Sequence, residues 1–296
     1  MATPAQWVAG ARPRTLPAAV APVLVGTGAA YAVASGVVWK AVLALAVSLA
    51  LQVGVNYAND YSDGIRGTDA VRVGPFRLVG SGSAAPAAVK RAAFLAFGLA
   101  ALLGLVLAVT TSWWLVAVGA MAIAAAWFYT GGSHPYGYAG LGELFVFVFF
   151  GLVAVCGTTF VQVGRVTSLS VVVAIPVGFL ACAILVANNL RDIPTDTTSG
   201  KRTLAVRLGD RRTRGLYAIL VLAPFVVAFL APLLLDGAGA RRWWYLLAVL
   251  AAPLVLPPLR TVLRGAVGRD LIPVLRDTGR LQLAYALLLG LGLAVS

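Results

Sequence analysis

Charged residues and cysteines are both scarce in this chain of 296 residues. Only 11% of the residues are charged and 60% are hydrophobic, whereas an ordinary soluble domain has about 25% charged and about 45–50% apolar residues. So little charge excludes a conventional soluble protein and indicates one that lies in a lipid bilayer. The two cysteines, Cys156 and Cys182, fall inside apolar stretches and lack the spacing of a disulfide framework or a metal site, so we expect them to be packing residues.

Long apolar stretches make up most of the sequence, and their lengths are close to the roughly 20 residues that cross a bilayer core. They run near Leu16–Val38, Ala41–Tyr57, Ala92–Thr110, Trp113–Tyr129, Leu141–Gln162, Leu169–Val186, Leu216–Leu235, Trp243–Leu263 and Leu281–Ala294. We therefore predict an all-α integral membrane protein in which nine transmembrane helices form a single bundle, and in which residues 1–296 form one domain. The first stretch is longer than the core of a signal peptide, so we expect it to be a mature helix.

Membrane topology accounts for much of the net charge of +13. If the N-terminus is cytoplasmic, all but four of the 23 lysines and arginines fall on the cytoplasmic side; the four are Lys40, Arg165, Arg241 and Arg242. Cytoplasmic loops of membrane proteins carry this excess of cations. We therefore expect a multi-pass protein of the cell membrane, with its C-terminus on the outer side and no nucleic-acid partner.

Acidic residues are rarer still, and half of the ten occur in two short segments. The first segment holds Asp60, Asp63 and Asp69 at the end of the second stretch; the second holds Asp192 and Asp196 at the end of the sixth. Both contain Asn-x-x-x-Asp, a spacing that places oxygen atoms on one face of a helix. Carboxylates grouped near hydrocarbon need compensation, which a hard cation such as Mg²⁺ supplies. The predicted magnesium ligands are Asn56, Asn59, Asp60, Asp63, Asn188, Asp192 and Asp196, and the four aspartates among them are the predicted catalytic residues.

Basic residues flank both acidic segments and could bind the oxygens of a metal-held diphosphate. They are Arg66, Lys201 and Arg202. The alternative is that these cations only set the topology. A diphosphate held at the mouth of a helix bundle would leave an attached chain in or beside the lipid, so a polyprenyl diphosphate fits the predicted site.

These segments together resemble the UbiA-type intramembrane prenyltransferases, and three stretches resemble the menaquinone branch of that superfamily. The stretches are Arg12-Pro-Arg14-Thr-Leu-Pro, Asn59-Asp60-Tyr-Ser-Asp63 through Asp69, and Asn188-Asn189-Leu-Arg-Asp192 through Gly209. The resemblance covers nearly the whole chain. It implies a nine-helix fold, bound Mg²⁺, and transfer of a polyprenyl group to 1,4-dihydroxy-2-naphthoate with loss of diphosphate and carbon dioxide.

The first motif departs from the superfamily's commonest form, because Gly67 stands where a third aspartate is usual; Asp69 is a candidate substitute. A loop rich in glycine and tyrosine, between Tyr129 and Glu143, resembles the menaquinone branch and is the candidate aromatic pocket. It also lacks a lysine that some relatives carry there, so we do not expect it to contact the diphosphate.

The candidate acceptor-binding residues are Arg14, Tyr129 and His134. Arg14 would grip a carboxylate or else anchor the chain at the membrane surface, and His134 would act as a base or else simply meet solvent. Glu143 suits the start of a helix.

Two other functions remain open at this level. Another aromatic acceptor, such as 4-hydroxybenzoate, would leave the diphosphate half of the site unchanged. A cation-coupled transporter would also carry acids inside the membrane, but nearer its midplane. Aromatic rings at Tyr57, Tyr61, Phe145 and Phe149 could stabilise an allylic cation or serve only for packing.

Overall fold

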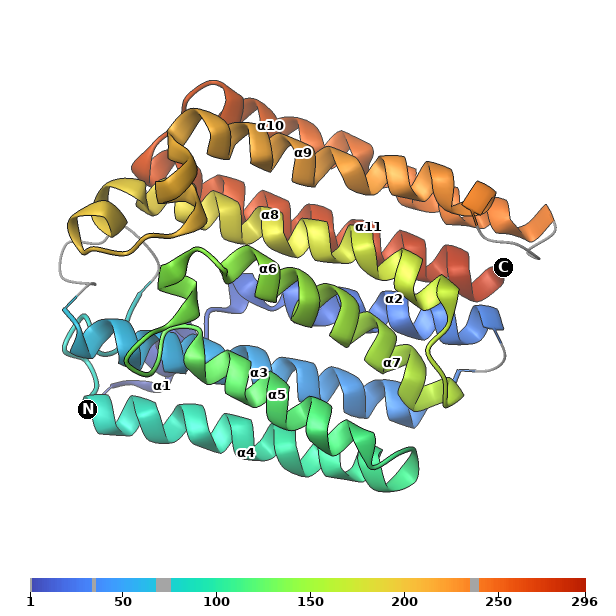
Figure 1. Ribbon diagram of the computed structural model, residues 1–296, viewed down its shortest axis with the longest axis horizontal. Helices are drawn as coiled ribbons and strands as arrows, with labels where there is room; N and C mark the ends of the chain where they lie inside the picture. The colour runs from blue at the N-terminus through green and yellow to red at the C-terminus, as the bar shows by residue number, and fades with distance from the viewer. Residues whose placement is uncertain (1, 34–35, 68–75, 235–239) are drawn as a thin grey trace.

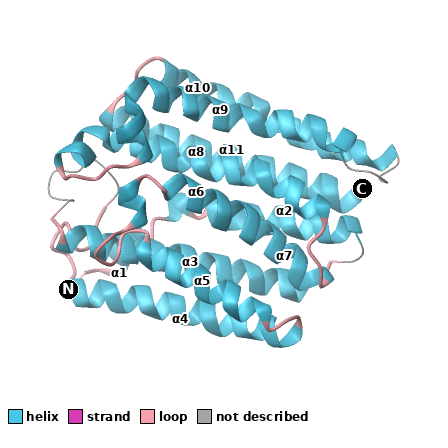
Figure 2. Cartoon of the chain, viewed as in Figure 1, coloured by secondary structure: helices cyan, strands magenta, loops and turns pink. Residues whose placement is uncertain are grey.

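The structure is a computed structural model that describes residues 2–33, 36–67, 76–234 and 240–296. In those residues the chain is helical and has no strand (Figure 2). The helices are α1 (Pro4–Gly10), η1 (Pro13–Thr15), α2 (Pro17–Val33), α3 (Val38–Ile65), α4 (Pro86–Thr110), α5 (Trp114–Phe128), η2 (Tyr136–Ala139), α6 (Gly142–Val146), η3 (Phe147–Val153), α7 (Ala154–Val163), α8 (Ser168–Thr198), α9 (Leu204–Leu234), η4 (Ala240–Val255), α10 (Leu256–Leu263), η5 (Gly268–Leu271) and α11 (Ile272–Val295).

The long helices lie side by side along the long axis of the molecule (Figure 1). The ends of α3 and α8, the short helix α1 and the loop between α5 and α6 gather at the end of the bundle where the N-terminus lies. The C-terminus lies at the opposite end. Both acidic segments belong to the end of a long helix, α3 or α8, so the fold brings them to the same end of the bundle.

The membrane-spanning character of the chain is confirmed, but the number of spans is not. Among the described residues, seven helices are long and apolar enough to cross a membrane, and the number is eight if the bent pair Pro4–Thr15 with Pro17–Val33 counts as one span. The fourth predicted span is the apolar helix Trp114–Phe128, which has 15 residues. At about 1.5 Å per residue it is shorter than the roughly 30 Å of a bilayer core. The protein is therefore a multi-pass helical membrane protein.

Exposed tryptophans mark the end of the bundle opposite the acidic segments. Trp39 is the second residue of α3, Trp113 and Trp114 lie at the start of α5, and Trp243 and Trp244 lie near the start of η4. Tryptophan is enriched where membrane helices meet the interface with water. These positions therefore indicate one boundary of the bilayer, with the acidic segments near the other.

Small residues let the helices pack closely. A Cβ atom on Gly28 of α2 would overlap the backbone of Gly290 of α11, so only glycine permits this approach. The larger of two buried clusters joins α2, α7, α8, α9, η4 and α11, and a smaller one joins α1, α3 and α4. The cavity described next lies where these two groups of helices face each other.

Candidate active site

A cavity of about 460 Å³ opens among the gathered helix ends. Its walls come from η1, α3, the α5–α6 loop, α8, the α8–α9 connection and the start of α11. Its polar lining residues include Arg12, Arg14, Asn59, Asp63, Arg77, Tyr129, Tyr138, Asn188, Asn189, Asp192, Asp196 and Lys201. Most residues predicted from the two acidic segments therefore share one site, although about 130 residues separate the segments in the chain.

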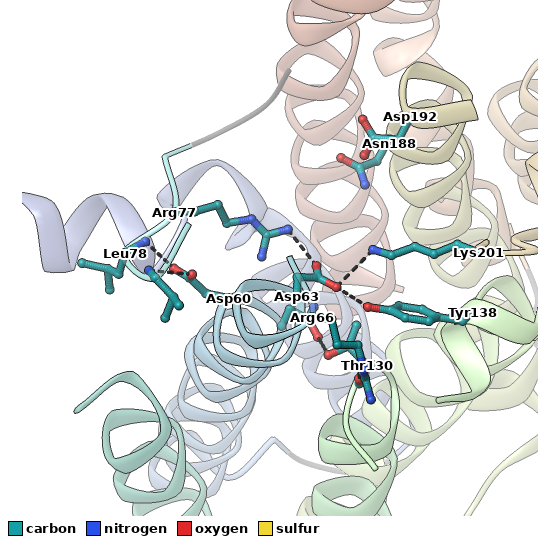
Figure 3. Close-up of polar contacts among 12 residues, drawn as sticks. Asp60, Asp63, Arg66, Arg77, Leu78, Thr130, Tyr138, Asn188, Asp192 and Lys201 are labelled. Carbon is teal, nitrogen blue, oxygen red and sulfur yellow. Dashed lines mark hydrogen bonds and ion pairs between the residues drawn. The ribbon is translucent and has the colours of Figure 1, made fainter. Parts of the chain in front are cut away.

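Asp63 lies at the centre of a buried polar cluster (Figure 3). Its Oδ1 accepts hydrogen bonds from Lys201 Nζ at 3.1 Å and from the Tyr138 hydroxyl, and its Oδ2 accepts one from Arg77 Nη2 at 3.2 Å. Burial, and next the charge of Asp63, raise the pKa of Tyr138 above its ordinary value, so the phenol stays protonated and donates. The Lys201 ammonium also lies 4.4 Å from the centre of the Tyr138 ring. One carboxylate thus holds two cations at the cavity wall.

Asp192 is compensated in a different way, by the residue before it. Arg191 contacts both carboxylate oxygens of Asp192, at 2.7 and 2.8 Å, and also donates to Asn188 Oδ1 at 2.8 Å. Asp196 lies one helical turn later and lines the same cavity. The i, i+4 spacing that predicted a shared face is therefore realised on α8 for Asn188, Asp192 and Asp196.

The oxygen atoms around the cavity suit a hard cation. Asn59, Asp63, Asn188, Asp192 and Asp196 all line it, and carboxylate and amide oxygens are ligands of Mg²⁺. Among the described residues, no three acidic, histidine or cysteine side chains come together. A cation here would therefore rely on one or two carboxylates together with amide oxygens, water and substrate phosphate, which is the usual coordination of Mg²⁺.

Two predicted ligands have other partners in the structure. Asp60 is fully buried, and its two oxygens accept hydrogen bonds from the backbone N–H groups of Leu78 and Val79 at 2.7 and 3.1 Å. Figure 3 shows its carboxylate turned away from that of Asp63. Asn56 donates to Ala11 O at 2.8 Å and to the Thr15 hydroxyl at 2.9 Å. Asn56 and Asp60 thus fasten neighbouring segments to α3.

The three predicted diphosphate-binding residues do not all line the cavity. Lys201 lines the cavity. Arg66 donates instead to the carbonyl oxygens of Thr130 and Gly132, and its guanidinium lies 5.3 Å from the centre of the Tyr138 ring. Arg202 is exposed, and its backbone N–H donates to Tyr138 O at 2.9 Å. Both arginines therefore hold the α5–α6 loop in place rather than face the cavity.

The three predicted acceptor-binding residues do not all line the cavity either. Arg14 and Tyr129 line the cavity, whereas His134 is exposed and contacts Ser133 Oγ at 3.0 Å. His134 is therefore in contact with solvent, which is one of the two alternatives stated for it. Glu143 does begin a helix, α6, where it accepts a hydrogen bond from Asn189 at 2.9 Å. Asp69 lies outside the described residues.

A second, more apolar cavity of about 320 Å³ lies between α3, α4, α5 and the α6–η3–α7 segment. Residues that line both cavities include Asn59, Tyr129 and Phe150. Phe145 and Phe149 line the apolar cavity, whereas Tyr57 and Tyr61 pack against Trp7 and Trp127 respectively. The polar site thus adjoins an apolar space among the membrane helices.

Sequence reasoning did not single out Arg77, Tyr138 or Arg191 as site residues. Arg77 lies in a loop and Tyr138 in the short helix η2, and neither has a fixed spacing from Asp63 that could have indicated the contact. Arg191 did carry a signal, since a cation directly beside Asp192 can form a local ion pair.

The comparisons with known proteins agree with this geometry. The model described as "UbiA prenyltransferase family" matches residues 19–269. The chain is 58% identical to "1,4-dihydroxy-2-naphthoate octaprenyltransferase" of Mycobacterium tuberculosis, over 97% of this chain and 96% of the relative. It is 36% identical to the Escherichia coli protein of the same description, over 98% and 95%. Among solved structures, a UbiA homolog from Archaeoglobus fulgidus bound to GPP and Mg²⁺ has a TM-score of 0.67 at 14% identity, covering 98% of this chain and 100% of that one. At that identity the structural likeness establishes the fold.

Proposed function

Because the chain belongs to the UbiA prenyltransferase family, we propose that it transfers a polyprenyl group from a polyprenyl diphosphate to 1,4-dihydroxy-2-naphthoate. Diphosphate and carbon dioxide leave, and the product is demethylmenaquinol, the reduced form of demethylmenaquinone. The observation that carries the proposal is the full-length similarity to relatives described as acting on this naphthoate, the first of them at 58% identity. The polar cavity beside an apolar one gives the physical support.

The charges around the polar cavity suit a diphosphate and a cation together. From the part of the chain that the structure describes, its lining holds three carboxylates, those of Asp63, Asp192 and Asp196, and four cations, those of Arg12, Arg14, Arg77 and Lys201. Without a metal, a diphosphate would be repelled by the carboxylates. Without a diphosphate, a metal ion would be repelled by the cations. Both together leave each charge with an opposite partner, which supports joint binding.

The proposed magnesium ligands are Asn59, Asp63, Asn188, Asp192 and Asp196, which all line the cavity. When bound, Mg²⁺ supplies positive charge to the oxygens of the departing diphosphate, a Lewis-acid role. Lys201 lies 3.1 Å from Asp63 and supplies a further point charge to the same leaving group. The Arg66 guanidinium would need to leave its loop contacts to reach the diphosphate, so we assign Arg66 to holding the loop. Arg202 is exposed and does not line the cavity, so we do not assign it to the diphosphate.

The prenyl chain fits the apolar cavity, because Asn59, Tyr129 and Phe150 border both spaces and so mark where diphosphate and chain would meet. Phe145 and Phe149 present aromatic faces in that cavity, and such faces stabilise a developing cation. The apolar walls also exclude water, which protects the allylic cation from hydrolysis. Arg14, at the polar mouth, is placed to bind the carboxylate of the naphthoate through its fork of N–H donors.

Residues from both halves of the chain complete the one cavity, and this supports a single functional domain over residues 1–296. We further propose that the cavity faces the cytoplasm and that the protein resides in the cell membrane. The excess of lysines and arginines at the cavity end supports this orientation.

Product mass tests the proposal directly. Purified protein is incubated with Mg²⁺, a polyprenyl diphosphate and an equimolar mixture of 1,4-dihydroxy-2-naphthoate and 4-hydroxybenzoate. We expect the prenylated, decarboxylated naphthoate as the product. Prenylated benzoate alone would reassign the acceptor, and no prenylated product with either acid, from protein that is folded and binds the diphosphate, would contradict the proposed reaction.

A further inference from the structure

We propose that Asn189 binds the 4-hydroxyl of the aromatic acceptor through its amide oxygen, and that Glu143 is the positioning residue that turns this oxygen toward the polar cavity. The proposal rests on the proposed prenyl transfer to a dihydroxynaphthoate, since it concerns the second substrate of that reaction. It makes Asn189 the residue that distinguishes a dihydroxylated aromatic acid from a monohydroxylated one.

Glu143 is fastened to α8 at two points. Its backbone oxygen accepts a hydrogen bond from the Cys182 thiol at 3.1 Å, and its carboxylate Oε1 accepts one from Asn189 Nδ2 at 2.9 Å. Positions 182 and 189 are about two helical turns apart, so both lie on the face of α8 that meets α6 (Figure 1). Glu143 and Asn189 are 9% and 7% exposed. The two side chains are therefore held against each other inside the bundle.

The hydrogen bond to Glu143 sets the direction of the Asn189 amide. An ionised carboxylate only accepts hydrogen bonds, so the amide nitrogen faces Glu143 and the amide oxygen faces away from it. Asn189 lines the polar cavity, and among the described residues its Oδ1 has no hydrogen-bond partner. A polar atom in so buried a side chain normally has a partner. The cavity wall thus presents an acceptor atom to a donor inside the cavity.

Asn189 lies where the polar and the apolar cavities meet. Leu185, one helical turn before it on α8, lines both cavities, and so does Tyr129. A Cβ atom on Gly142 would lie 3.3 Å from Leu185 Cδ2 and 3.4 Å from Tyr129 Cε2. The start of α6, where Glu143 lies, therefore packs against both of these side chains. An acceptor ring that receives the prenyl chain has to lie at this junction, beside Asn189.

The 4-hydroxyl is the group of the naphthoate that needs such a partner. The 1-hydroxyl is adjacent to the carboxylate and hydrogen-bonds to it within the molecule, whereas the 4-hydroxyl has no internal acceptor. Arg14, assigned to the carboxylate, comes from η1, and Asn189 comes from α8, so the two contacts hold the ring from different walls of the cavity. A site built to bind a hydroxyl discriminates against an analogue that lacks it, because the buried acceptor is then left unpaired.

The role of Asn189 is tested by comparing two ligands, 1,4-dihydroxy-2-naphthoate and 1-hydroxy-2-naphthoate, which lacks the 4-hydroxyl. Their dissociation constants are measured by isothermal titration with Mg²⁺ and a slowly reacting prenyl thiolodiphosphate. The wild type should bind the dihydroxy acid about tenfold more tightly than the monohydroxy acid. Asn189→Leu, which has a similar volume but no amide, should reduce this ratio to about one, mainly by weakening the dihydroxy acid. A wild type without the preference, or an unchanged ratio in folded Asn189→Leu, would overturn the assignment.

Gln162→Leu is the matched control. Gln162 is 8% exposed, its Nε2 donates to Thr158 O at 2.9 Å, and it lines neither cavity. This variant also removes a buried amide from the bundle and should keep the wild-type ratio. If Asn189→Leu does not fold, Asn189→Ala gives the same comparison. A tenfold rise in the half-saturating Mg²⁺ concentration for turnover in either Asn189 variant would identify a metal ligand and overturn the proposal.

The role of Glu143 is tested with Glu143→Leu, Glu143→Gln and the double variant Glu143→Leu/Asn189→Leu. A positioning residue predicts that Glu143→Leu lowers the ligand ratio about as far as Asn189→Leu does, and that the double variant is no lower than either. Glu143→Gln keeps an oxygen acceptor for Asn189 Nδ2 and should retain most of the ratio. Equal weakening of both ligands in Glu143→Leu, with the ratio unchanged, would show a purely structural role and overturn the assignment of Glu143.

The same measurements separate this proposal from the proposed function. If the wild type forms no prenylated naphthoate but its ligand ratio depends on Asn189, the function fails and the site assignment stands. If the wild type forms prenylated naphthoate and its ligand ratio is indifferent to Asn189, the site assignment fails alone.

Discussion

Asp63→Asn removes the carboxylate that compensates two buried cations and so tests the charge balance of the cavity. Asp63, Arg77 and Lys201 have side chains that are 5%, 8% and 11% exposed. Breaking such a pair by removing one partner costs about 3–5 kcal/mol, because the other charge stays buried without compensation. The cavity admits water, so we expect the lower end, about 3 kcal/mol. For a chain of this size, that corresponds to a fall in Tm of about 6 °C.

The assay is thermal unfolding in detergent without Mg²⁺ or substrate, so that it reports on the protein's own charges. Asp277→Asn is the matched control, since the ion pairs of Asp277 among the described residues are with the exposed cations Arg276 and Arg280, and it should shift the Tm by less than about 1 °C. Adding Lys201→Met to Asp63→Asn should recover part of the lost stability, because it removes one uncompensated cation. A wild-type Tm in Asp63→Asn, or a double variant as unstable as the sum of its parts, would refute the reasoning.

Three further predictions concern substrates and topology. Arg14→Lys keeps a cation at the cavity mouth but loses the two-pronged contact, so it should raise the KM for the naphthoate and leave that for the prenyl diphosphate unchanged; an unchanged naphthoate KM and rate would remove Arg14 from the site. Thr197→Cys, in a chain whose native cysteines are replaced by alanine, should resist an impermeant thiol reagent in intact cells and react once the cells are opened; labelling from outside would reverse the orientation. Gly157→Leu projects a side chain into the apolar cavity, where a Cβ meets no atom within 4 Å, so it should lower kcat/KM more for long prenyl diphosphates than for short ones. Gly98→Leu, on the exposed face of α4, is its control, and equal effects of the two variants on long and short substrates would show that the cavity does not hold the chain.

The helices could be predicted from the sequence, because a membrane span needs length and apolarity and both can be read directly from the order of the residues. All nine predicted stretches overlap helices. The number of spans could not be settled this way, because Trp114–Phe128 is short and because α1 precedes the first stretch. That helix begins at a capping box formed by Thr3 and Gln6, a polar signal that a hydropathy reading passes over.

The acidic site could be predicted where it depends on helical spacing. Residues four apart share a face, and this placed Asn188, Asp192 and Asp196 together, as it did Asn59 and Asp63. The same rule does not separate Asp60 from Asp63, because residues three apart are only about 60° apart around a helix. The two carboxylates differ because Asp60 binds the backbone N–H groups of Leu78 and Val79, a contact that the spacing does not predict. The contact between Arg77 and Asp63 could not be predicted, since it depends on where a loop returns to the bundle.

The fate of the acceptor's carboxyl group tests the central claim most directly. Purified protein is given Mg²⁺, a polyprenyl diphosphate and 1,4-dihydroxy-2-naphthoate labelled with ¹³C in the carboxyl carbon, and the prenylated product, diphosphate and labelled carbon dioxide are measured together. The proposed reaction predicts one diphosphate and one labelled carbon dioxide for each prenylated naphthol, with no label left in the product. A prenylated product that keeps the label, or release of diphosphate without any prenylated acceptor, would contradict it.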